Sequence, residues 1–201
     1  MKKMAKLLAV LLMMVLCVST ASASMLGDTY YLEDLHMSMS VPAGYYVFTR
    51  DIAANDPVLT ALGMNREYVV SFLEENQLYL NAIEENVFNE VTVAMSPNTI
   101  ETFSGLSDVV LDVVTDAIPE ELATQGMNVS KTELYENDEA KFIVIYYTVV
   151  DEYGNTNHVK QYFTIYNYQA INFRLFSYVG PLSEADEELL LQVVDSAKFG
   201  V

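Results

Sequence analysis

Hydrophobic and polar positions alternate along much of the chain, and this period of two predicts several strands. Residues 29–41 read as a strand, and a turn at residues 42–44 leads into a second one at residues 45–48. We therefore expect an N-terminal hairpin. Strand periodicity returns at residues 77–82 and 87–95.

Helices are indicated by capping residues that precede apolar stretches. Asp56 stands before a proline and Asn65 before a second apolar stretch, which predicts two short helices. Ser107 begins a third helix that we expect Pro119 to interrupt. Ser183, with an aspartate three residues later, caps the last helix. The apolar stripe of the third helix is expected at Val110, Val113, Val114 and Ala117.

The C-terminal part reads as a run of strands with short connections. These strands are expected at residues 129–135, 140–150, 159–166 and 170–178. Short connections favour an antiparallel meander. Because residues 140–150 are apolar on both faces, the sheet must be covered on both sides. The fold class is therefore α+β, one antiparallel sheet flanked by helices on both faces as an α/β/α sandwich, in a single domain at residues 24–201.

The first 23 residues have the layout of a secretory signal peptide. Three lysines precede an apolar run at residues 7–18, and a small-x-small site ends at Ala23. We expect cleavage between Ala23 and Ser24 and a secreted or extracytoplasmic protein. A lipoprotein signal at Cys17 is the alternative, but a bulky leucine precedes that cysteine where a small residue is required.

Composition then limits the partners. The 201 residues hold 10 Lys and Arg against 28 Asp and Glu, a net charge of −18, and the expected leader contains three of the cations and none of the acids. Such a surface repels nucleic acid and anionic lipid, so we expect neither nucleic-acid binding nor stable membrane insertion. Divalent cations are electrostatically permitted. Cys17 is the single cysteine, and its loss with the leader would exclude disulfides and thiolate chemistry. We expect a monomer.

Several segments carry a family resemblance. They are residues 31–35 (YLEDL), 40–42 (SVP), 140–147 (AKF through YY), 161–163 (QYF) and 193–199 (VVDSAKF). In this pattern the chain resembles secreted bacterial proteins of the PsbP-like superfamily. The resemblance implies an α/β/α sandwich used for binding, as in extrinsic photosystem subunits and a nuclear-import factor, without shared catalytic residues.

A search for chemistry assigns no catalytic, cofactor or metal residue. The two histidines, His36 and His158, have no Gly-x-Ser-x-Gly elbow to serve, and they are too few for a zinc site. No calcium loop, phosphate loop or dinucleotide fingerprint is present. Aspartates at 108, 112 and 116 share one helix face, which we interpret as solvated. The many carboxylates leave a glycosidase-type pair open, although the chain has no tryptophan.

Tyrosine is the most unusual feature, with 14 in the chain, concentrated in the C-terminal strands. Tyrosines hold sheets together and are also enriched at interfaces. Arg174 alternates with Asn172 and Phe176 on the last strand, and it is open either to a carboxylate partner, which the acidic composition favours, or to an anionic ligand. A binding face is therefore hypothesised at Tyr162, Tyr166, Tyr178 and Arg174.

The sequence leads to a secreted, noncatalytic binding or accessory protein for a protein or small ligand. A cell-envelope hydrolase with a carboxylate pair is the alternative from another class. A third reading is an extracytoplasmic calcium-responsive protein.

Overall fold

The computed structural model describes residues 27–201. The expected leader and its cleavage point between Ala23 and Ser24 lie outside them. Helices within the described residues are α2 (Pro57–Leu62), α3 (Arg66–Glu75), α4 (Asp108–Thr124) and α5 (Glu184–Ser196), with a 3-10 turn, η2, at Glu33–Leu35. Strands are β1 (Thr29–Leu32), β2 (Met37–Ser40), β3 (Tyr45–Thr49), β4 (Leu78–Glu84), β5 (Asn89–Pro97), β6 (Met127–Glu136), β7 (Lys141–Val150), β8 (Thr156–Tyr166), β9 (Gln169–Ser177) and β10 (Lys198–Phe199).

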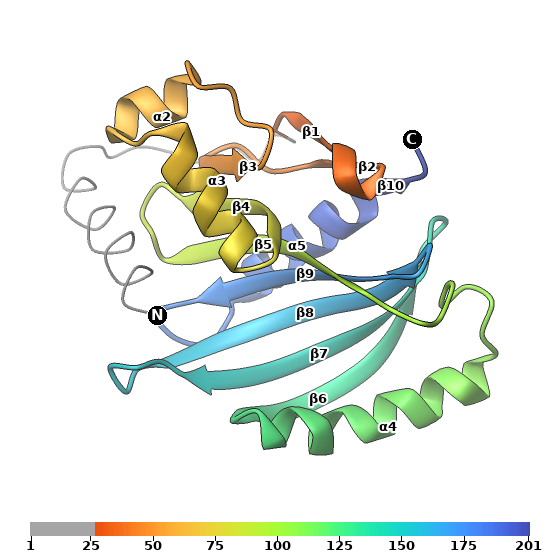
Figure 1. Cartoon of the computed structure of the whole chain (residues 1–201). Helices are drawn as coiled ribbons and strands as arrows, with labels where there is room; N and C mark the ends of the chain where they lie inside the picture. The colour runs from red at the N-terminus through yellow and green to blue at the C-terminus, as the bar shows by residue number, and fades with distance from the viewer. Residues whose placement is uncertain (1–26) are drawn as a thin grey trace.

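Seven of these strands form one antiparallel sheet in the order β3-β4-β5-β9-β8-β7-β6. The expected C-terminal meander of β6 to β9 is confirmed. Helix α5 and a small sheet of β1, β2 and β10 cover one face, while α2, α3 and α4 lie on the other (Figure 1). The predicted fold class, an antiparallel sheet with helices on both faces, is confirmed.

Each face has its own core. The face toward α5 holds the largest cluster, in which Phe173, Leu175 and Met39 are fully buried. On the opposite face, α2 and α3 bury residues over β3 to β5, and α4 buries a separate group over β6 to β8. The central strand β9 therefore runs between two helical covers on that face (Figure 1).

The capping predictions are confirmed for Asp56, Asn65 and Ser183, whereas Ser107 precedes α4 as expected but its side chain forms no capping hydrogen bond. The Asp56 side chain accepts from the Val58 amide, and the Asn65 side chain accepts from the Tyr68 amide. Ser183 forms a capping box with Asp186 at the start of α5. These residues act within one helical turn, so the local sequence is sufficient to predict them.

The expected N-terminal hairpin is wrong. The 3-10 turn η2 divides residues 29–41, and β1 pairs with β2 within that segment. Strand β3 leaves this small sheet and pairs with β4 at the edge of the large one. His36 makes the division possible by adopting a left-handed conformation, with φ 45°, directly after the turn.

The expected stripe of α4 is wrong at Val110, Val113 and Ala117, although Val114 does pack toward the sheet, and Pro119 does not interrupt the helix. Leu111 and Thr115 are the buried positions, whereas Val113 is 66% exposed. Residues on both sides of Pro119, Ile118 and Leu122, pack onto the sheet and hold the helix together across the proline. An apolar flank thus remains uncovered.

Candidate functional site

One row of side chains crosses the middle of the large sheet and is polar throughout. Asn81, Thr92, Arg174 and Gln161 stand directly opposite one another on β4, β5, β9 and β8. They point to the face that carries α3 and α4, where Ile83 on β4, and Ile145 on β7 opposite Gln161, pack into the cores under those helices. We call this polar row and its neighbours Glu90, Asn172 and Phe176 the central face.

Hydrogen bonds occupy the side-chain amide of Gln161. The Oε1 atom of Gln161 accepts from Arg174 Nε at 2.9 Å and from Tyr147 Oη at 3.3 Å. The Nε2 atom of Gln161 donates to Asn172 Oδ1 at 2.8 Å. Gln161 is thereby held in one orientation, and it fixes the guanidinium group of Arg174 through its Nε–H.

The remaining groups are mainly donors. In residues 27–201, no carboxylate forms an ion pair with Arg174, and its two terminal nitrogens form no hydrogen bond. Thr92, directly opposite on β5, is 3% exposed, and its buried hydroxyl has no hydrogen-bond partner among the described residues. A buried polar atom without a partner costs about 1–3 kcal/mol, so an arrangement of surplus donors suits an incoming acceptor.

The positive charge of Arg174 affects the pKa of a neighbouring tyrosine. Burial raises the pKa of Tyr147, and the positive charge of Arg174 opposes that rise. Glu90 lies one row further along and is held separately, because its carboxylate accepts from Asn81 Nδ2 and from Tyr178 Oη. The one acid that shares this face is therefore occupied by neutral donors and leaves the arginine unpaired.

Burial raises the pKa of Glu90 above its ordinary value, while the hydrogen bonds from Tyr178 and Asn81 oppose the rise. The carboxyl proton of Glu90 is therefore bound more tightly in the folded chain than in the unfolded chain, where the pKa of a glutamate is about 4.3. Below about pH 4.3 the bound proton contributes its full stabilisation to the folded chain. This stabilisation is lost as the pH rises through the pKa that Glu90 has in the folded chain. Glu90→Gln should remove this loss, so its gain in unfolding free energy over the natural chain should grow from pH 4 toward neutrality. Denaturant unfolding at several pH values measures it.

Glu85→Gln is the matched control, because it removes the same charge from an exposed turn. It should leave the pH dependence of stability parallel to that of the natural chain. Equal pH profiles for Glu90→Gln and Glu85→Gln would contradict the assignment of this proton to Glu90.

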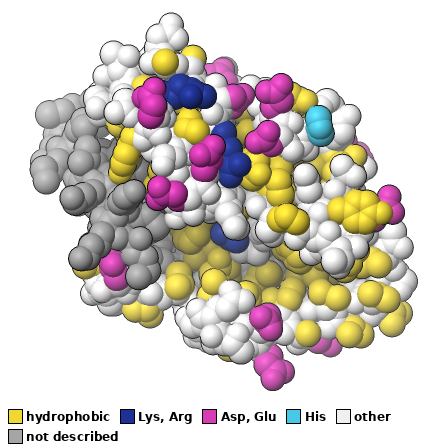
Figure 2. Space-filling view, viewed as in Figure 1, with side chains coloured by type: hydrophobic (Ala, Val, Ile, Leu, Met, Phe, Trp, Pro, Cys, Tyr) yellow, Lys and Arg dark blue, Asp and Glu magenta, His cyan; other side chains and the backbone are white. Residues whose placement is uncertain are grey.

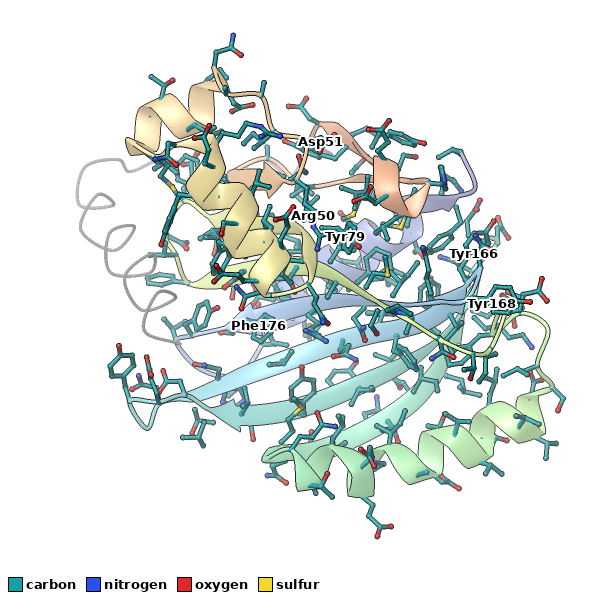
Figure 3. All side chains as sticks on the ribbon, viewed as in Figure 1. Arg50, Asp51, Tyr79, Tyr166, Tyr168 and Phe176 are labelled. Atoms are coloured by element: carbon teal, nitrogen blue, oxygen red, sulfur yellow. The ribbon has the colours of Figure 1, made fainter. Side chains whose placement is uncertain are left out.

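The hypothesised tyrosine face does not come together. Tyr162 is 3% exposed and lies in the core toward α5. Tyr166 stacks on Phe199 with ring centroids 4.9 Å apart, and Figure 3 shows it with Tyr168 at the end of the sheet away from Phe176. Tyr178 binds Glu90 and stacks on Phe176, so of the three tyrosines it alone borders the face that holds Arg174.

A cleft of about 650 Å³ lies elsewhere, beside the C-terminal tail. His36, Ser104, Glu101 and Glu139 are among its lining residues, so a carboxylate pair and a serine share one cleft with a histidine. Its chemistry is nevertheless poor. Lys198 lies 2.8 Å from Glu139 and lowers the pKa of that carboxyl, whereas the general acid of a glycosidase needs a raised one. No hydrogen bond joins His36 to Ser104 in the described part of the chain.

Metal ligands do not converge either. Within residues 27–201 no group of three or more His, Cys, Asp or Glu side chains is placed to hold an ion. Asp108, the first of the three aspartates on α4, pairs with Lys141 at 2.7 Å. None of the helices within those residues is long and apolar enough to cross a membrane.

The central face was only partly visible in the sequence. Arg174 stood out because cations are rare, but Thr92, Gln161 and Glu90 were missed. The available signal was the polar side chains at alternate positions in strands that are otherwise apolar, since a sheet covered on both faces should bury such positions.

Comparisons with known proteins assign no function to the chain. No family model and no curated protein matches the chain. The solution structure of cyanobacterial PsbP (CyanoP) from Synechocystis is similar over 91% of this chain and 96% of its own, with 15% identity and a TM-score of 0.49. A Bacteroides thetaiotaomicron structure is 13% identical over 87% of this chain and 49% of its own, with a TM-score of 0.44. A Pseudomonas aeruginosa protein of unknown function is 13% identical over 84% and 94%, with a TM-score of 0.37.

Proposed function

We propose that the chain is a secreted, noncatalytic binding protein and that its central face holds an anionic ligand through the guanidinium group of Arg174. The observation that carries the proposal is the unpaired state of that group. The chain has 28 acidic residues, yet none of those in the described part pairs with Arg174. A guanidinium group with free N–H groups can bind a carboxylate through two parallel hydrogen bonds.

Rigidity supports binding over catalysis at this place. Arg174 stands in the middle of a seven-stranded sheet, with hydrogen-bonded neighbours on both sides. Gln161 fixes its Nε atom and is itself fixed by Tyr147 and Asn172. Because these side chains are already ordered, less binding free energy is lost in ordering them when a ligand binds. The face offers donors to a negative charge, and none of the described residues that form it is a histidine or a serine.

The simplest probe is butanoate, a small carboxylate with little apolar surface. Titration calorimetry should give one weak site, and Arg174→Gln should weaken it about tenfold or more, since a hydrogen bond to a charged group contributes about 1.5–3 kcal/mol. Lys131→Gln is the matched control because it removes one positive charge from an exposed side chain that is paired with Glu133. It should change the affinity less than about twofold.

Arg174→Gln and Lys131→Gln should both melt within a few degrees of the natural chain, so a loss of binding is not a loss of folding. Equal butanoate affinity in the natural chain and the Arg174 variant would refute the proposal. An equal loss in both variants would also refute it, because the effect would then come from net charge alone.

A further inference from the structure

An apolar flank on α4 lies next to the anion site and is not used by the fold. Val110 is 45% exposed and Val113 66% exposed, and Ala117 is also on the surface. At 3.6 residues per turn these three positions fall on one side of the helix, whereas Asp112 and Asp116 fall on the other. Apolar side chains on the solvent side of a helix do not contribute to packing of the core. Exposed apolar patches of this kind mark binding surfaces.

The flank is continuous with the central face. Val114 lies between the exposed valines and the buried side of α4, and it packs in the same cluster as Phe176 and Tyr147. Figure 2 shows hydrophobic side chains gathered along α4 and onto the sheet between α4 and α3, with acidic side chains around the edge. Figure 3 places Phe176 on this part of the sheet. The surface thus joins a cation to an apolar strip.

We propose that the ligand is an amphiphilic carboxylate, a straight-chain fatty acid whose head binds Arg174 and whose tail lies along the valine flank of α4. This inference rests on the proposed function and names its ligand class. A small polar anion would leave the valines uncovered. A cationic amphiphile would meet the charge of Arg174, and an uncharged one would leave its donors unpaired.

The distance to be covered sets a minimum length for the tail. Strand β8 separates β9, which carries Arg174, from β7, whose residues pack under α4. Two strand spacings amount to about 10 Å, so a tail of about eight carbons is needed to reach the flank. Butanoate is too short, and octanoate and decanoate are long enough.

The test is a calorimetric series of butanoate, octanoate and decanoate, with decyltrimethylammonium as the probe of opposite charge. A fully buried methylene strengthens binding about fourfold, so half-buried methylenes on an open surface should give about twofold each, roughly 16-fold from butanoate to octanoate and a further fourfold, roughly, from octanoate to decanoate. Val113→Ser should remove much of the gain from octanoate to decanoate, where the tail extends onto the flank, and leave butanoate binding unchanged. Val150→Ser, at a similarly exposed valine on the far end of β7, should change neither.

The outcomes separate the two proposals. Butanoate binding that depends on Arg174 but does not strengthen with chain length would overturn the fatty-acid ligand and leave the anion site. Failure of Arg174→Gln to weaken butanoate binding would overturn the anion site itself. Decanoate binding that is unchanged by Val113→Ser, or decyltrimethylammonium binding as strong as that of decanoate, would overturn the inference. So would sedimentation showing that the flank joins two copies of the chain and that octanoate leaves the pair intact.

Discussion

Tyr162→Ala should be among the most damaging single substitutions in the chain, lowering the unfolding free energy by about 3–5 kcal/mol. The ring lies in the core between the sheet and α5, at 3% exposure. It packs edge-on against Tyr135, with centroids 5.5 Å apart, and against Phe142 at 6.1 Å. Its removal leaves a cavity among rigid strands that cannot close over it. Denaturant unfolding followed by circular dichroism measures the loss.

Tyr162→Phe is the control for that loss. The Tyr162 hydroxyl forms no hydrogen bond with any residue from 27 to 201, so its removal should change stability by about 0.5 kcal/mol or less. A mild effect of the alanine variant, or equal effects of both variants, would show that Tyr162 is not a core residue. Such a result would return it to the hypothesised binding face.

Lys160→Ala should also destabilise the fold, by about 1.5–3 kcal/mol, the range for losing a hydrogen bond to a charged group, because the lysine is buried while the Glu187 side chain is 36% exposed. Lys160 is 5% exposed and its Nζ lies 3.0 Å from Glu187 Oε2. The ammonium group also lies over the rings of Tyr146 and Tyr162, at 5.1 and 5.5 Å from their centroids. Its removal leaves Glu187 with the Tyr146 hydroxyl at 3.1 Å and empties the space that the lysine stem filled.

A double variant separates the two parts of that cost. If the lost ion pair dominates, Lys160→Met with Glu187→Gln should recover most of the stability, because no charge is left without its partner and the stem volume is kept. The comparison is made by chemical unfolding of the double variant, of Lys160→Met alone and of Lys160→Ala, because Lys160→Met keeps the stem volume and leaves Glu187 without its lysine. A double variant no more stable than Lys160→Met alone would show that the ion pair is not the reason.

The elements that were predicted well are those decided by neighbours in sequence. Asp56, Asn65 and Ser183 each cap a helix through a bond to an amide two or three residues away. The first hairpin failed because strand pairing is decided at long range. Residues 45–49 pair with β4, more than thirty positions away, and no local signal competes with that register.

Helix α4 failed for a different reason. It is apolar on more than one side, and periodicity alone does not say which side lies on the sheet. The same ambiguity hid the valine flank. The candidate site was hidden by register, because Thr92 and Arg174 become neighbours only when β5 pairs with β9, and Gln161 joins them only through β8. The rarity of cations in the sequence was enough to single out Arg174. The residues around it could be known only from the strand register of the folded sheet.

The anion site can be observed directly, because the chain has only three arginines. Each has an Nε–H held by a hydrogen bond: Arg50 to the Leu78 carbonyl, Arg66 to the Ile52 carbonyl and Arg174 to Gln161. A nitrogen–proton correlation spectrum of the arginine side chains should therefore show three resolved signals, which single Arg→Gln variants assign. Titration with octanoate should shift the Arg174 signal in a saturable way and leave those of Arg50 and Arg66 in place. An unmoved Arg174 signal, or equal shifts of all three, would contradict a carboxylate site on the central face.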